Sequence, residues 1–312
     1  MLNSELSEFR LNQGLREAIG PEIGELLAEP GVTDVMCNAD GRVFVDRMGI
    51  GRADSGVRLS AANAEYALRM LASHAGRVLT KKTPILSASM PGTGERVAGT
   101  VWPITAAPTF AIRKPPPDIF PLSAFSGTEF PVLRRTDGPE NETNMQKLLR
   151  AVAERRNILI AGGTSSGKTA LLSSLLAIPS VARDRCIITE DRQEIMVAAP
   201  DHVRMLVSED VSLKDLGQLA MRYRPDRVIC GEIRDGAAAM EWLKACNTGH
   251  SGSFCTIHAN SAASALGRLE DLCGEVCPIV PTRSIKEAIG CIVSTAKTET
   301  GGRGLREVLL LD

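Results

Sequence analysis

The sequence predicts an α/β protein whose larger part is a parallel β-sheet covered by helices. From residue 141 onward, apolar runs typical of buried strands alternate with segments of helical periodicity, as in a doubly wound sheet. A glycine-rich loop joins one of these runs to a helix at residues 162–169. The first 114 residues instead combine hairpin patterns with helices, which indicates a smaller N-terminal α+β domain.

Length and composition are those of a globular protein with two domains. The 312 residues are 44% hydrophobic and 23% charged, which is enough for two separate cores. The net charge is −1 and Lys and Arg do not cluster, so there is no strong signal for direct DNA binding. Eight scattered cysteines, several inside apolar runs, predict reduced thiols in the cytoplasm. The longest uncharged window, residues 97–112, is too short for a membrane-spanning helix, so we expect a soluble chain.

The N-terminal domain is predicted to contain two helices and five strands. Residues 1–29 have loose helical periodicity, which Pro21 interrupts. Ser60 is a suitable N-cap for a helix over 61–75, and Gly76 is a suitable stop. The strands expected from alternation and turn residues cover residues 32–37, 42–47, 85–90, 95–102 and 109–114.

A proline-rich segment separates the two predicted domains. Pro115, Pro116 and Pro117 cannot continue a helix or a β-ladder, and more prolines follow at 121, 131 and 139. We therefore divide the chain into an N-terminal α+β domain, an extended linker and a C-terminal domain, over residues 1–114, 115–140 and 141–312.

The C-terminal domain is predicted to alternate helices with buried strands. Ser212 with Asp215 resembles a capping box, and Asp235 is a suitable N-cap for the next helix. Helices are expected at 145–154, after the glycine-rich loop, after Ser212, and at 235–246, 261–272 and 283–289. Strands are expected at 158–160, 186–191, 227–232 and 254–258, followed by a terminal pair at 291–297 and 304–310.

Residues 162–169 match the phosphate-binding pattern G-x-x-x-x-G-K-[ST]. Glycines let backbone N–H groups approach phosphate oxygens without a Cβ in the way, and the following helix directs its positive end at them. Lys168 is expected to reach the β- and γ-phosphates of ATP, and Thr169 to ligate Mg²⁺. The residues predicted to bind nucleotide are Gly162, Gly163, Thr164, Ser165, Ser166, Gly167, Lys168, Thr169 and Ala170.

Three predicted strands after the loop end in Glu190–Asp191, Glu232 and His258. The carboxyl ends of parallel strands converge at one edge of a sheet, so we expect these side chains near the loop. Position 231 is glycine where many nucleotide hydrolases have a magnesium-holding aspartate. Glu232 is therefore expected to orient the metal's water, the attacking water, or both. His258 is expected to sense the γ-phosphate or polarise the transition state, with a core imidazole as the alternative. The predicted catalytic set is Lys168, Glu190, Glu232 and His258, and the predicted metal ligands are Thr169 and Glu232.

Four ordered segments make the chain resemble the type II/type IV secretion traffic ATPases. The segments similar to the family's Walker A motif, Asp box, Walker B motif and His box are residues 162–169, 189–194, 222–235 and 248–262. The segments most similar to its conjugative-transfer, TrbB-like branch are residues 40–42, 94–96 and 110–115. One departure is Arg192, which stands where many relatives have threonine.

The resemblance implies a RecA-like P-loop NTPase core with ATP and Mg²⁺, in a homohexameric ring that binds ATP between the two domains. It implies ATP hydrolysis that energises pilus assembly or substrate transfer through a type IV secretion channel. The implied location is the cytoplasmic face of the inner membrane, with secretion-complex proteins of that membrane as partners. It also implies that arginines of the small domain or linker approach the γ-phosphate; the candidates are Arg96, Arg113 and Arg134, and the motif around Arg113 matches best.

Alternative functions remain open at this point. A nucleotide-dependent scaffold would dock on a secretion complex but hydrolyse ATP too slowly to do work. Intact Lys168, Thr169 and Glu232 favour a motor instead. Within the family, a pilus-assembly or type II secretion ATPase is the nearest competitor. A small-molecule kinase has no support, because the first 114 residues contain no recognisable substrate-binding signature.

Overall fold

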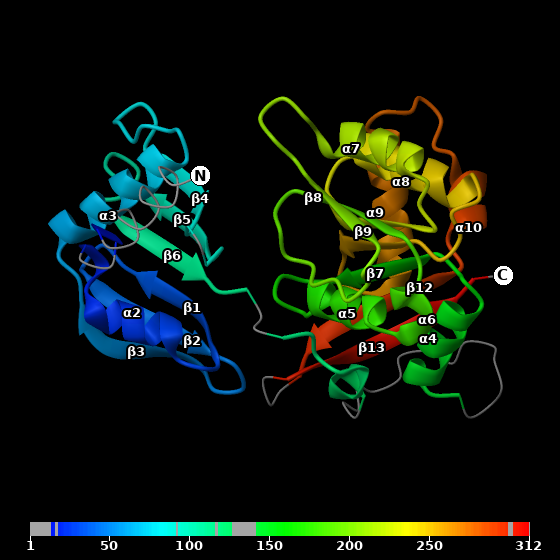
Figure 1. Ribbon diagram of the computed structural model, residues 1–312, viewed down its shortest axis with the longest axis horizontal. Coiled ribbons are helices and arrows are strands. Elements are labelled where there is room, and N and C mark those ends of the chain that lie inside the picture. The colour runs from blue at the N-terminus through cyan, green and yellow to red at the C-terminus, as the bar shows by residue number, and fades with distance from the viewer. Residues whose placement is uncertain are drawn as a thin grey trace. The chain divides into compact units, whose positions relative to one another are not determined.

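The computed structural model describes residues 14–15, 18–91, 93–115, 118–126, 142–298 and 302–311. The chain divides into two compact units, residues 1–117 and 118–312. Each unit contains one β-sheet with helices packed against it (Figure 1). Within the described residues, no helix is both long and apolar enough to span a membrane.

The first unit is built on a six-stranded antiparallel sheet in the order β3-β2-β1-β6-β5-β4. Its strands are β1 (Val32–Cys37), β2 (Arg42–Arg47), β3 (Gly51–Arg58), β4 (Ile85–Ser89), β5 (Arg96–Thr100) and β6 (Thr109–Arg113). Helices α2 (Pro21–Ala28) and α3 (Ala61–His74) share one hydrophobic core with the sheet. The five predicted strands and the predicted α+β class of this unit are confirmed.

One detail of the first unit confirms the prediction and another differs from it. Pro21 marks a break as predicted: residues 18–19 are helical, Gly20 is not, and α2 begins at Pro21, because a residue in the first turn does not need an N–H group. Strand β3 was not predicted, because most of its side chains are exposed and it lacks apolar alternation. Backbone pairing with β2 holds it in the sheet. Ser60 caps α3 as predicted, and its side chain accepts a hydrogen bond from the Asn63 amide at 3.2 Å.

The second unit is built on a seven-stranded sheet in the order β13-β12-β7-β11-β10-β8-β9. Its strands are β7 (Ile158–Gly162), β8 (Cys186–Glu190), β9 (His202–Leu206), β10 (Arg227–Ile233), β11 (Phe254–His258), β12 (Cys291–Lys297) and β13 (Arg303–Leu310). Every pair is parallel except β12 with β13, so the predicted parallel sheet is confirmed. Strand β9 was missed, because in this five-residue edge strand only one residue, Met205, is buried.

Helices cover both faces of the second sheet (Figure 1). One face carries α4 (Asn144–Ala153), α5 (Lys168–Leu176) and α6 (Pro179–Ala182). The other face carries α7 (Leu213–Ala220), α8 (Gly236–Asn247), α9 (Ala262–Gly274) and α10 (Thr282–Ala288). Strand residues alternate between the two cores: Leu159 belongs to one, whereas Ile158 and Ile160 belong to the other. Because both faces are buried, the strands are continuous apolar runs.

Part of the segment that we predicted as an extended linker packs in the second unit. Leu122–Phe125 form a 3-10 helix, and Phe125 is buried in the core that contains α5. The Ser174 hydroxyl of α5 donates a hydrogen bond to the Phe120 carbonyl at 2.6 Å. Residues 118–126 are thus fastened to α5, and residues 127–140 lie outside the described part of the chain.

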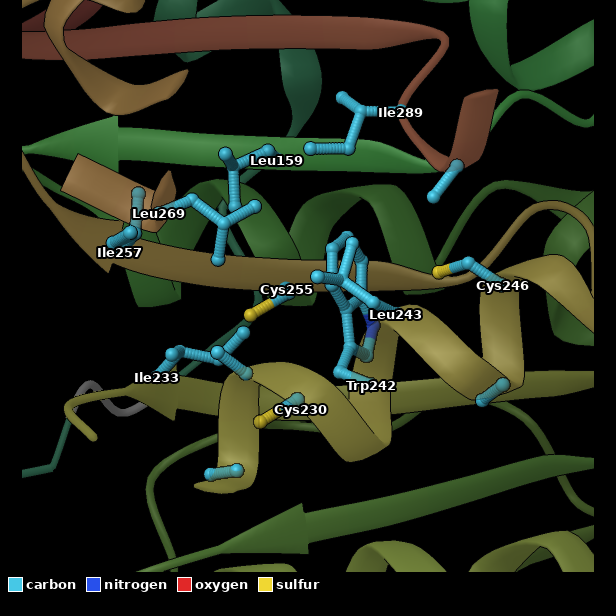
Figure 2. Packing of buried hydrophobic residues seen from close by; sticks show 14 of the residues in the cluster. Leu159, Cys230, Ile233, Trp242, Leu243, Cys246, Cys255, Ile257, Leu269 and Ile289 are labelled. Carbon is cyan, nitrogen blue, oxygen red and sulfur yellow. The ribbon is translucent and has the colours of Figure 1, made fainter. Parts of the chain in front are cut away.

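Seven of the eight cysteines belong to the hydrophobic cores, and Cys277 is partly buried. Figure 2 shows Trp242 and Cys246 of α8 packed with Cys230 of β10 and Cys255 of β11. All eight cysteines are free, as predicted, and burial raises the pKa of the Cys255 thiol well above its ordinary value. A buried thiol with a raised pKa is a poor nucleophile, so the Cys255 sulfur acts as a small apolar group.

Arg227 at the start of β10 is a buried arginine that joins three segments. Its side chain is 1% exposed, and its Nε donates to Asp184 Oδ2 at 2.6 Å. Its Nη1 donates to the Gly252 carbonyl at 2.6 Å, and its guanidinium lies 5.5 Å from the centre of the Phe254 ring. Asp184 precedes β8 and Gly252 precedes β11, so one side chain ties together the beginnings of three neighbouring strands.

Replacement of Arg227 by alanine should lower the free energy of unfolding by about 3 kcal/mol. The change leaves a cavity, an unpaired Gly252 carbonyl and a partly unpaired Asp184 carboxylate. Urea denaturation measures the loss. Arg283→Ala is the matched control, because Arg283 is 91% exposed and pairs with Glu287 at the surface. Equal unfolding midpoints for the two variants would show that Arg227 has no such role.

Candidate phosphate-binding site

The loop between β7 and α5 is held in shape by strands β12 and β13. Ser165 has a φ of 60° and Gly167 a φ of 99°, so the backbone passes through left-handed conformations before α5 begins. The Ser166 hydroxyl lies 3.0 Å from Thr295 Oγ1 of β12. Arg303 of β13 donates from Nε to the Ser165 carbonyl at 3.2 Å. Contacts from β12 and β13 therefore stabilise the loop conformation, in addition to the turns within the loop.

Close packing requires two of the loop glycines, whereas a third faces open space. A Cβ on Gly162 would overlap the Ser166 hydroxyl, and a Cβ on Gly167 would lie 2.7 Å from Arg303 Cδ. A Cβ on Gly163 would meet no atom within 4 Å among the described residues. The backbone at Gly163 is thus open to an approaching group, as a phosphate cradle requires.

Lys168, the first residue of α5, is folded back onto the loop. Its Nζ donates to the Gly162 carbonyl at 2.9 Å and to the Gly163 carbonyl at 3.1 Å. The side chain is 9% exposed, and this burial lowers the pKa of the ammonium, while Glu232 acts in the opposite direction. Thr169 follows it in the first turn of α5, where the helix dipole is positive. The cation and the helix end thus face the same loop.

Glu232 lies in a β-bulge near the carboxyl end of β10. Cys230 pairs with Cys255 and Ile233 with Ile257, so two residues of β10 stand opposite one of β11. The bulge directs Glu232 toward the loop, where its Oε1 is 3.8 Å from Lys168 Nζ. The structure therefore brings together Lys168 and Glu232, as the sequence predicted.

Arg234, which the sequence analysis did not single out, contacts two carboxylates at this edge of the sheet. Its Nε and Nη2 both donate to Glu232 Oε2, at 2.8 Å and 2.6 Å. Its Nη1 donates to Asp191 Oδ2 at 2.7 Å. Asp191 directly follows β8, the neighbour of β10. The only signal in the sequence was a charged residue two positions after Glu232.

Glu190 has a different environment from Glu232. Its side chain is 2% exposed, and its Oε1 accepts hydrogen bonds from the amides of Glu194 at 3.0 Å and Ile195 at 2.8 Å. Its Oε2 lies 3.3 Å from Arg204 Nε, although the two atoms are not aligned for a hydrogen bond. Burial is the main cause that raises the pKa of Glu190 from 4.5 to about 7. These contacts come from the segment after β8 and from β9.

His258 is the last residue of β11 and pairs in register with Gly162 of β7. Its side chain is exposed, so the structure places an imidazole beside the start of the loop and not in the core. His250 instead lies at the end of α8, with Nδ1 3.1 Å from the Ala245 carbonyl. His202 contacts the Ala199 carbonyl at 2.7 Å. These two histidines therefore have local structural roles.

Two of the three candidate γ-phosphate arginines lie together in the first unit. Arg96 of β5 is paired in register with Arg113 of β6, so both are on one stretch of that sheet. Arg113 Nε donates to Asp34 Oδ1 of β1 at 2.7 Å. Arg134 lies outside the described residues.

One protein family covers more than half of the chain. The family described as "Type II/IV secretion system protein" matches residues 136–297. The "Probable conjugal transfer protein TrbB" of Sinorhizobium fredii is 36% identical over 308 residues, which cover 98% of this chain and 91% of that protein. The "Type IV secretion system protein VirB11" of Bartonella quintana is 33% identical over 234 residues, which cover 64% of this chain and 65% of that protein.

Solved structures show the same fold. The ATPase DotB of Legionella pneumophila has a TM-score of 0.65 at 19% identity, with 97% of this chain and 81% of that chain covered. The pilus retraction motor PilT with bound ADP has a TM-score of 0.63 at 22% identity, with 93% and 82% covered. These structures support a RecA-like core preceded by a smaller domain, as the resemblance implied. By the match of its residues 136–297 and its likeness to TrbB over nearly its whole length, the chain belongs to the type II/IV secretion system protein family.

Proposed function

We propose that this chain is an ATP-hydrolysing motor of a type IV secretion or conjugative transfer system. The observation that carries the proposal is a complete phosphate loop whose Lys168 lies 3.8 Å from Glu232. Glu232 lies near the end of β10, which β11 separates from β7 in the sheet. The similarity to TrbB over 98% of the chain favours conjugative transfer over pilus assembly or type II secretion. The likeness to PilT is one of fold, so it does not favour pilus retraction.

The residues present fit ATP and Mg²⁺. The Gly163 backbone is open, Lys168 is a cation beside it, and α5 directs its positive end at the same place. Mg²⁺ keeps several waters and takes phosphate oxygens, so it needs only one or two protein ligands such as Thr169 and Glu232. When bound, Mg²⁺ neutralises charge on the phosphate oxygens.

In this proposal, three side chains divide the chemistry. Lys168 binds the phosphates and stabilises the negative charge that develops on them. Glu232 Oε1 accepts a hydrogen bond from the attacking water and thereby orients it, while Oε2 stays with Arg234. His258, exposed beside Gly162, is in position to donate a hydrogen bond to a phosphate oxygen. We keep three arginines as candidates for contacting the γ-phosphate: Arg113, Arg96 and Arg134.

In this proposal Glu190 holds the segment after β8 in place. This role replaces the catalytic role expected from the sequence. The Glu190 carboxylate accepts hydrogen bonds from two backbone amides and lies beside Arg204. These contacts fix the segment that follows β8, which includes Asp191. Glu232 is the partly exposed carboxylate, at 24%, and it is the one that lies near Lys168. We therefore assign the orientation of water to Glu232 and the anchoring of the 191–195 segment to Glu190.

The working form that we propose is a homohexameric ring at the cytoplasmic face of the inner membrane, in contact with secretion-complex proteins. The family resemblance is the basis for this part of the proposal. In such a ring, ATP hydrolysis would move the first unit relative to the second and pass that motion to the membrane complex. Native mass measurement with and without ATP tests the ring size.

Lys168→Ala should weaken ATP binding and lower the rate of phosphate release by at least about 100-fold, because the phosphates lose their cation. Titration with a fluorescent ATP analogue and a phosphate-release assay measure the two effects. Lys286→Ala is the control, because Lys286 is an exposed lysine of α10. Unchanged binding and turnover in Lys168→Ala would rule out this loop as the nucleotide site.

Glu232→Gln keeps the shape of the side chain but removes its charge. We expect ATP to bind with nearly unchanged affinity and hydrolysis to fall by about 100-fold or more, because the attacking water is no longer oriented by a carboxylate. Single-turnover phosphate release and a conjugative transfer assay measure the outcome. A motor binds ATP and stalls, so transfer stops. Persisting transfer in this variant would favour a nucleotide-dependent scaffold.

The buried Glu190 should make the protein less stable as the pH rises from about 4.5 to about 7. Over this range the unfolded chain releases the proton while the folded chain retains it, so the folded state loses up to about 3 kcal/mol relative to the unfolded state. Glu190→Gln should remove this part of the pH dependence. Urea denaturation at several pH values measures it, and parallel stability curves for both proteins would contradict the assignment.

A further inference from the structure

We propose that Arg234 is a positioning residue that holds Glu232 in its working orientation and that Asp191 acts through Arg234 alone. The inference rests on the proposed ATP hydrolysis and concerns how the carboxylate is aimed. It assigns a role to two residues that lie side by side at the ends of β10 and β8.

The two oxygens of the Glu232 carboxylate have different partners. Arg234 Nε and Nη2 donate to one oxygen only, Oε2, at 2.8 Å and 2.6 Å. The other oxygen, Oε1, is the one that faces Lys168, at 3.8 Å, which is longer than a hydrogen bond. Arg234 therefore fixes the plane of the carboxylate and leaves Oε1 directed at the phosphate loop. A lysine cannot reproduce this contact, because it lacks the rigid planar fork.

Arg234 is itself held in place by a second carboxylate, that of Asp191. Its side chain is 58% exposed, so a single ion pair with Glu232 would hold it only weakly in water. Asp191 Oδ2 accepts from Nη1 at 2.7 Å and restrains the third nitrogen of the same guanidinium. Asp191 is 34% exposed and adjoins the buried Glu190, so the arginine is tied to a rigid part of the sheet. Two carboxylates from neighbouring strands thus share one cation.

Arg234 also balances the charges of the two carboxylates. Glu232 and Asp191 carry charges of the same sign on neighbouring strand ends, and the guanidinium between them neutralises their repulsion. Loss of Arg234 would release Glu232 from a fixed orientation. Such a loss should reduce the chemical step more than nucleotide binding, because Lys168 and the loop remain intact.

The test is a double-mutant cycle on the full-length protein with ATP and Mg²⁺. We expect Arg234→Gln to lower kcat by about 10-fold and Asp191→Asn by about 3-fold, with nucleotide affinity within about 2-fold of wild type. Asp191→Asn should have no further effect in the Arg234→Gln background. Arg234→Lys should behave like Arg234→Gln, because a lysine keeps the charge but lacks the planar fork. Arg283→Gln and Glu287→Gln, an exposed pair on α10, are the matched controls.

Each other outcome overturns the inference. Additive effects of the two substitutions would show that Asp191 does not act through Arg234. A rise in kcat in Arg234→Gln would show that the arginine restrains Glu232 in a less active orientation. A selective loss of nucleotide affinity in this variant would show that the arginine binds the phosphates directly. Unchanged kcat in Arg234→Gln would reduce the contact to a surface ion pair. If wild type itself does not hydrolyse ATP, the proposed function fails and not this inference alone.

Discussion

The parallel pairing of β7 with its two neighbours is the constraint on which the site depends. Gly162, the last residue of β7, stands in register with His258 of β11 on one side and Thr295 of β12 on the other. The phosphate loop therefore starts between an exposed imidazole and the hydroxyl that braces Ser166. Parallel strands need crossover connections, and the helices in those connections bury both faces of the sheet. Core packing thus fixes the register, and the register fixes the site.

Burial gives the two glutamates at the strand ends different environments, and the different roles that we propose for them rest on this difference. Glu190 is almost fully buried. Two backbone amides and the nearby Arg204 stabilise the ionised form of its carboxyl group. The low dielectric around it raises its pKa, so it serves better as an anchor than as a group that contacts water. Glu232 keeps contact with solvent at 24% exposure and lies on the side of Lys168. Similar positions at adjacent strand ends therefore do not imply similar functions.

The sequence predicted the parallel sheet and the loop well, because both depend on local signals. Apolar runs, N-caps such as Ser212 and the glycine spacing are all visible without the fold. Strand β3 was not visible, because its stability comes from backbone pairing and its exposed side chains carry no pattern. Arg234 was missed for a related reason: its partners Asp191 and Glu232 come from two strands, and only the strand order makes them neighbours.

Gly231 explains why the carboxylate near Lys168 is a glutamate at position 232. A Cβ at 231 would lie 3.1 Å from Glu190 Cγ, so an aspartate there would need the space that Glu190 already fills. The Thr256 hydroxyl donates to the Gly231 carbonyl at 2.6 Å and holds the strand at this point. There is little room for a side chain at residue 231, and the bulge in β10 directs the next residue toward the loop. Three features therefore act together on the position of Glu232: Gly231, the buried Glu190 and the bulge in β10. We expect a change in any of them to displace Glu232.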